Sequence, residues 1–273
     1  MNEKVKNNAK NIVQLMEENM VRENRQLLSA YIGGTELYGL KDNNKPIIRG
    51  IFLEDAEEIL AFPNNYFASS IVLKDEFTDI KIYEMSTVMK NIIRGKIEGW
   101  EALYANQCKE THLSFKLREF VSDLKPDLAT IAGTAIMDSY TILEKDVVKT
   151  PVFFDMLKNL IIAMHFLKTG SLDLSLAHYI EDYKLLTLCD FDKLLNKMES
   201  NDNIIPFKYH ELIDEITGEI KKDMQDLKIS EGLNSGITEF EYLKIRQFII
   251  ETRIDKLLSE NLISQNPKFD VIE

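Results

Sequence analysis

The chain has 273 residues, of which 45% are hydrophobic and 29% are charged, as in a globular protein that buries a sizeable core. Its 45 acidic and 33 basic residues give a net charge of −12, which disfavours binding to extended nucleic acid. The sequence contains no run of about 18 apolar residues, so we expect neither a membrane span nor a membrane partner.

The first 20 residues and the cysteine content both bear on where in the cell the protein is located. Residues 1–20 are charged and amphipathic without a continuous apolar segment, so no signal peptide is expected. Cys108 and Cys189 are the only cysteines and lie in unrelated contexts, which favours neither a disulfide framework nor a metal cluster. We therefore expect a cytoplasmic protein.

The first third of the chain alternates helix and strand signals. Residues 3–25 carry an apolar stripe with helical period. Strands are predicted at 27–32, 46–53 and 78–83 from their β-branched residues or their alternation, with helices at 54–61 and 85–95. Gly33 and Gly34 follow the first strand, where two glycines allow a tight turn.

From residue 97 onward nearly all signals are helical. Helices are predicted at 98–108, 111–123, 126–147, 152–168, 190–199, 208–227 and 238–260, with breaks at prolines and glycines. The prediction is an α+β fold. A small mixed-sheet domain, residues 1–108, is followed by a helical C-terminal domain, residues 109–273.

Several short motifs carry a family resemblance. The segment IGGTELYGLKDNNKPIIRGIF, residues 32–52, resembles the start of the polymerase-beta-like nucleotidyltransferases, in the RNA-repair-associated branch of bacteria and phages. Gly34-Thr35, Tyr38-Gly39-Leu40 and Arg49-Gly50 match the glycine–serine, aromatic–glycine–leucine and arginine–glycine elements of that branch. Further along, Glu101 and Leu103 match the end of an Asn-Pro-x-x-x-Glu-x-Leu segment. The resemblance implies a nucleotidyltransferase-like domain.

The resemblance also implies a two-metal site, from which this sequence departs. The superfamily holds two divalent ions with an Asp-x-Asp pair and a third carboxylate on a strand. Alignment on Arg49 puts Lys45 and Ile47 at the two aspartate positions, and neither side chain can ligate Mg²⁺. Asp79 takes the third position and is the catalytic candidate. No metal ligand is assigned, and Mg²⁺ is an expected cofactor only if the protein is an active enzyme.

The nucleotide-binding candidates are Gly34, Thr35, Lys45, Arg49 and Glu101. The glycine turn and the threonine hydroxyl suit a phosphate group, and the lysine and arginine supply positive charge. The resemblance adds the glutamate. Structural alternatives stand beside these roles: a turn needed for folding, a solvated lysine, and an ion pair of Arg49 with Asp79 or Glu101.

Three functional hypotheses follow. The first is a non-catalytic nucleotide- or partner-binding protein that keeps the nucleotidyltransferase fold as a scaffold. The second is an active nucleotidyltransferase that moves an NMP from an NTP to RNA or another hydroxyl acceptor. The third is a structural homo-oligomer with the segment EYLKIRQFIIETRIDKLL as its interface. The missing carboxylate pair favours the first, whose partner is a nucleotide or a protein; the oligomeric state stays open.

Overall fold

The computed structural model describes five strands and eight helices. The described residues are 3–33, 47–55, 69–74, 79–105, 107–124, 128–144, 150–170, 172, 174, 208–231 and 239–264. Most of the predicted helix at 54–61, and all of the one at 190–199, lie outside these ranges.

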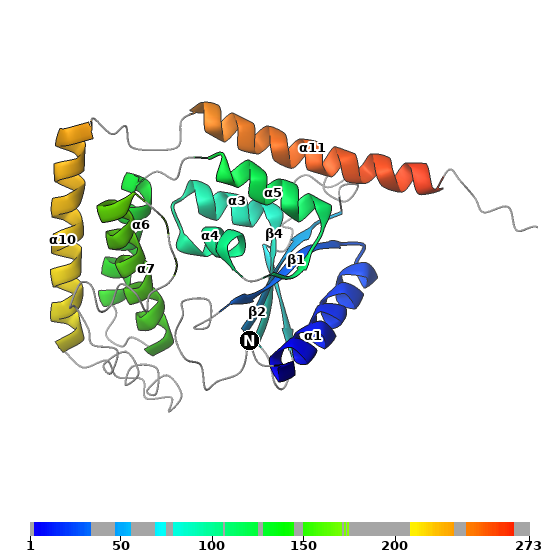
Figure 1. The fold of residues 1–273 in the computed structure, drawn as a ribbon, viewed down its shortest axis with the longest axis horizontal. Coiled ribbons are helices and arrows are strands. Elements are labelled where there is room, and N and C mark those ends of the chain that lie inside the picture. Colours follow the sequence, from blue (N-terminus) through cyan, green and yellow to red (C-terminus); the bar gives the residue numbers. More distant parts are fainter. Residues whose placement is uncertain are drawn as a thin grey trace, which may run out of the picture.

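The strands form one mixed sheet at the centre of the molecule (Figure 1). They are β1 (Gln26–Gly33), β2 (Ile47–Leu53), β3 (Ser70–Lys74), β4 (Asp79–Glu84) and β5 (Gln107–Glu110), in the order β3-β4-β2-β1-β5. Strands β2 and β4 are parallel, and the other neighbouring pairs are antiparallel. The mixed sheet and the helices that follow it confirm the predicted α+β fold.

Helix α1 (Glu3–Arg22) covers one face of the sheet (Figure 1). Met16 and Met20 on this helix pack with Ile48 and Phe52 of β2, all of them buried. The helix comes very close to β2, because a Cβ atom on Gly50 would lie 2.6 Å from Met16 Cε and 2.9 Å from the carbonyl oxygen of Ser29. The glycine of the Arg-Gly motif is therefore needed for packing.

Helices α3 (Met85–Ile93), α4 (Ile97–Tyr104) and α5 (His112–Ser122) cover the other face. Tyr31, Ile51 and Leu53 point into the core beneath them, with Trp100 of α4. Both faces of the central strands are thus buried. This explains why β2 is an almost continuous apolar run rather than an alternating one.

The remaining described helices extend the same core. Helices α6 (Leu128–Leu143), α7 (Thr150–Thr169) and α10 (Lys208–Glu231) pack on one another at one side of the sheet. Helix α11 (Glu239–Ser264) crosses over α3 and α5 (Figure 1). None of the helices in the described ranges combines the length and the apolar character needed to cross a bilayer.

Two details of the predicted elements were wrong. Strand β3 was missed, although Ile71-Val72-Leu73 is a short β-branched run. The predicted helix 98–108 ends at Tyr104, and β5 begins at Gln107, whose amide donates to the carbonyls of Ala102 and Ala105. Because β5 pairs with β1 as a polar edge strand, local periodicity does not reveal it. The proposed boundary after residue 108 falls within this strand.

Candidate functional site

The ends of strands β1, β2 and β4, where the candidate residues gather in the sequence, meet in one row of the sheet. Ile47, the first residue of β2, pairs with Gly33 at the end of β1 and with Asp79 at the start of β4. We call Gly33, Ile47 and Asp79 the strand-end row. The candidates Gly34, Thr35 and Lys45 lie outside the described residues, but Gly34 and Thr35 directly follow this row in the sequence.

The donor chemistry of the strand-end row does not fit a two-metal site. Mg²⁺ requires oxygen ligands, and the residue at its centre, Ile47, offers only a hydrocarbon side chain beside Asp79. Among the described residues, no group of three or more histidine, cysteine, aspartate or glutamate side chains has the arrangement of a metal site. We therefore assign no chemical step to a metal ion here.

A second row, two residues further into the sheet, is basic. Arg49 pairs with Tyr31 on β1 and with Lys81 on β4, and we call these three residues the Arg49 row. Successive side chains alternate between faces, so Arg49 shares a face with Ile47, two positions before it on β2. Lys81 also lies over the ring of Tyr83, with Nζ 4.8 Å from the ring centroid.

Gly33 leaves room for the side chain of Arg49. A Cβ atom on Gly33 would lie 2.8 Å from Arg49 Cγ, which is closer than real Cβ contacts allow. The arginine side chain therefore passes directly over Gly33. This is the close approach that the absence of a Cβ permits. In the sequence, Gly33 is followed by the candidates Gly34 and Thr35.

Tyr31 shows that the Arg49 row and Glu101 share one electrostatic environment. Burial raises the pKa of the Tyr31 hydroxyl well above its ordinary value, and the nearby Glu101 and Tyr83 raise it further. Arg49 acts in the opposite direction and lowers it. A buried phenol, a carboxylate and a guanidinium are thus close enough to influence one another on this face.

Glu101 forms a buried ion pair with helix α7. Its Oε1 atom lies 3.3 Å from Nζ of Lys158, and that ammonium is also 3.3 Å from Oδ1 of the more exposed Asp155. Glu101 thus links α4 to α7. Sequence reasoning named Glu101 through the family resemblance but missed its pairing with Lys158, because no local pattern connects residues 57 positions apart.

The structure also adds residues that the sequence analysis did not select. Lys81 lies within the alternating segment TDIKIY, so the alternation itself indicated its face of the strand. The sequence did not mark Tyr31 as a functional residue, because a tyrosine within an apolar strand is typical of a protein core. Its position beside Arg49 follows only from the antiparallel register of β1 and β2.

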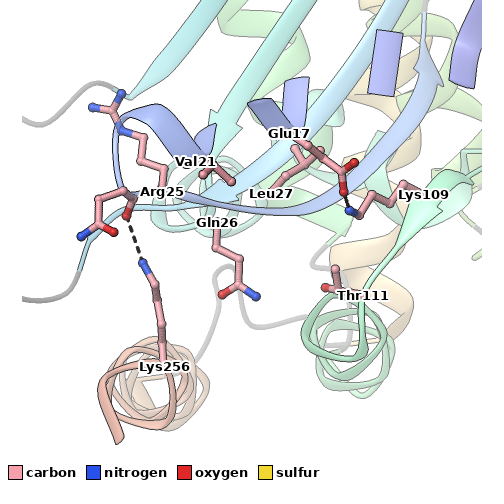
Figure 2. A pocket seen from close by; sticks show the side chains of 9 residues that line it. Glu17, Val21, Arg25, Gln26, Leu27, Lys109, Thr111 and Lys256 are labelled. Carbon is pink, nitrogen blue, oxygen red and sulfur yellow. Dashed lines mark hydrogen bonds and ion pairs between the residues drawn. The ribbon is translucent and has the colours of Figure 1, made fainter. Parts of the chain in front are cut away.

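A separate pocket of about 470 Å³ lies at the opposite end of β1, between α1, β5 and α11 (Figure 2). Its cations already contact protein oxygens. Lys109 pairs with Glu17, and Lys256 donates to the carbonyl oxygen of Asn24 at 3.4 Å. Arg25 pairs with the buried Glu54 at 2.8 Å. These contacts explain the pocket as the place where α11 docks on the α1–β1 turn, and we assign it no ligand.

Comparison with known proteins adds little to this description. No protein family matches the chain, and no curated protein sequence matches it. A solved structure of a nucleotidyltransferase-like protein from Exiguobacterium sibiricum aligns over 88% of this chain and 86% of that chain. The two are 11% identical, and the TM-score is 0.24. A likeness at this level carries no weight for the fold or the site, so the α+β assignment rests on the elements and registers described above.

Proposed function

We propose that this protein binds a nucleotide without transferring its nucleotidyl group, and that basic side chains replace metal ions as the partners of the phosphates. The observation that supports this most is the pairing of Ile47 with Asp79, next to the pairing of Arg49 with Lys81. A hydrocarbon stands where the sequence resemblance implies a metal ligand, and two cations stand beside it.

The chemistry of the two rows favours binding over catalysis. In two-metal phosphoryl transfer, the ions neutralise the charge that develops on the transferred group. Arginine and lysine neutralise phosphate in the ground state and form strong charge-assisted hydrogen bonds with it. They do not replace the ions that activate the attacking hydroxyl, so we expect affinity for nucleotide without turnover.

The direct test is isothermal titration of the protein with ATP, GTP, CTP and UTP, each with magnesium and with a chelator. We expect a dissociation constant on the order of 10–100 µM that changes less than about twofold when magnesium is removed. A labelled NTP should not be incorporated into RNA or protein acceptors with magnesium or manganese. Incorporation would favour the active transferase instead, and an absence of binding to all four nucleotides would contradict the proposal.

A second experiment asks whether the strand-end row is a lost metal site. The double variant with Lys45→Asp and Ile47→Asp puts carboxylates at the two positions where the sequence resemblance implies them, and position 47 pairs with Asp79. We expect this variant to bind nucleotide more tightly with magnesium than without it, unlike the wild type. Lys222→Asp combined with Met137→Asp, at exposed positions on α10 and α6, is the control that adds the same negative charge. A double variant that folds, judged by its circular dichroism spectrum, and still shows no magnesium effect would contradict this placement.

A further inference from the structure

The outward face of helix α11 carries a row of exposed apolar side chains. Phe240, Leu243, Ile250, Ile254 and Leu258 have exposed fractions between 47% and 65%. They recur at helical spacing over 19 residues, a length of about 27 Å. Single exposed apolar residues are ordinary, but five of them along one face of a helix indicate a surface that another molecule covers. We call this row the outer stripe.

The opposite face of α11 is already engaged with the body of the same chain. Phe248 stacks on Phe120 of α5 with ring centroids 4.4 Å apart, and Ile245 is buried. Arg253 donates to Glu84 at 3.0 Å. The helix is therefore held in place by the face that lies toward α3 and α5 (Figure 1), whereas the side chains of the outer stripe are exposed.

Apart from Leu258, which falls one residue after a d position, the residues of the outer stripe have the spacing of a two-stranded coiled coil. Phe240, Leu243, Gln247, Ile250 and Ile254 follow one another at intervals of three and four residues, which are the a and d positions of a heptad. Gln247 is the one polar residue in this series. A single polar residue at an a position is a known device for fixing the register of two paired helices.

We propose that the outer stripe pairs with the outer stripe of a second copy of this chain, with the two α11 helices parallel. In this arrangement Gln247 faces Gln247 of the second copy across the two-fold axis. The charges that flank the stripe are self-complementary, because Arg246 lies beside Glu251 of the second copy, twice by symmetry. An antiparallel pair would instead bring the Arg246 side of one helix against the Arg246 side of the other.

The docked helix lowers the cost of association. A free helix must first order its backbone, whereas the inner-face contacts already hold α11 in its helical form. The apolar stripe spans only two to three heptads of one helix, so the interface is at the small end of specific protein contacts. We expect a dissociation constant on the order of 10–100 µM. The pairing is independent of nucleotide binding, since the Arg49 row lies on the sheet and not on α11.

Light scattering coupled to size-exclusion chromatography tests the pairing. Across a concentration series, the mass should rise from that of the 31.6 kDa chain toward twice that value. Ile250→Glu and Ile254→Glu should each keep the protein monomeric at every concentration. Met137→Glu, which changes an apolar residue on α6 that is more exposed than either isoleucine, should leave the dimer intact. A wild type that stays monomeric throughout, or a dimer that survives Ile250→Glu, would overturn the proposal.

Two further variants test the orientation. Arg246→Glu should weaken the dimer at least several-fold, and adding Glu251→Arg should restore it. In a background with Cys108→Ser and Cys189→Ser, Gln247→Cys should form an intermolecular disulfide in an oxidising glutathione buffer, because position 247 faces its own copy. Met137→Cys in the same background should not. A dimer that is lost with Ile250→Glu, yet forms no disulfide through Gln247→Cys, would overturn the parallel arrangement.

Discussion

Lys158 of α7 and Glu101 of α4 form an ion pair with Nζ 3.3 Å from Oε1, and their side chains are only 4% and 11% exposed. The pair joins α4, one of the helices that cover the sheet, to α7, which packs against both α6 and α10. Charges buried to this extent lose most of their hydration, and the attraction between them offsets part of that cost. Asp155 lies on the solvent side of the same ammonium.

Removing one partner of this pair should destabilise the protein strongly. Lys158→Met leaves the Glu101 carboxylate buried without its ammonium, and we expect a loss of about 3–5 kcal/mol in the free energy of unfolding. Urea denaturation followed by circular dichroism measures it. Lys168→Met, also on α7, breaks a more exposed pair with Glu219 of α10 and should cost less than about 1 kcal/mol.

The double variant with Lys158→Met and Glu101→Gln should recover part of that loss, because it no longer buries a carboxylate that has lost its ammonium. A double-mutant cycle gives the coupling between the two residues. Equal losses from Lys158→Met and Lys168→Met would contradict the assignment of the buried pair as the structural link between α4 and α7.

Gly50→Ala should disturb the packing of α1 on the sheet. The added methyl would meet a backbone carbonyl as well as the flexible end of Met16, so the helix cannot relieve the clash by moving one side chain. We expect a loss of about 1–3 kcal/mol, as for overpacking in other cores. Gly133→Ala is the matched control, since its new methyl meets no atom within 4 Å in helix α6. That change should be neutral or stabilise the protein by up to about 1 kcal/mol.

Tyr31 should make the protein less stable at alkaline pH. The folded state raises the pKa of its hydroxyl, so above about pH 10 the unfolded chain releases a proton that the folded chain retains. The free energy of unfolding therefore falls as the pH rises through that range, and this effect is absent at neutral pH. Tyr31→Phe should flatten the alkaline decline in urea denaturation between pH 8 and about pH 11. Tyr242→Phe, at an exposed tyrosine on α11, should not.

The Arg49 row should set the affinity for nucleotide. Arg49→Met and Lys81→Met each remove a cation from the proposed phosphate site, and we expect each to weaken binding about tenfold, or 1.4 kcal/mol. Lys222→Met, at an exposed position on α10, changes the net charge equally and should have little effect. Isothermal titration with the best-bound nucleotide measures all three variants. Equal affinities across the set would place the phosphates elsewhere.

Local sequence patterns predicted most of this fold because most elements repeat a simple period. The apolar stripe of α1 and the alternation of β4 gave their positions to within a few residues. The polar edge strand β5 has neither pattern, and its existence depends on the open edge of β1. The site divides in the same way. Arg49, Asp79 and Glu101 stood out by motif, whereas Lys158 and Tyr31 acquire their surroundings only through distant pairing.

The anchoring of α11 also has a consequence for the order of events during synthesis. Lys256 contacts the carbonyl of Asn24 across 232 residues of chain. At a ribosomal rate of about 5–20 residues per second, the α1–β1 turn waits about 10–50 seconds for its partner helix to be made. During that interval the α1 face of the sheet can already close, because its core is built from residues that precede β5, with Cys108 packed at its margin. We therefore expect the nascent chain to hold a partly ordered sheet before α11 docks, and the pocket in Figure 2 to form last.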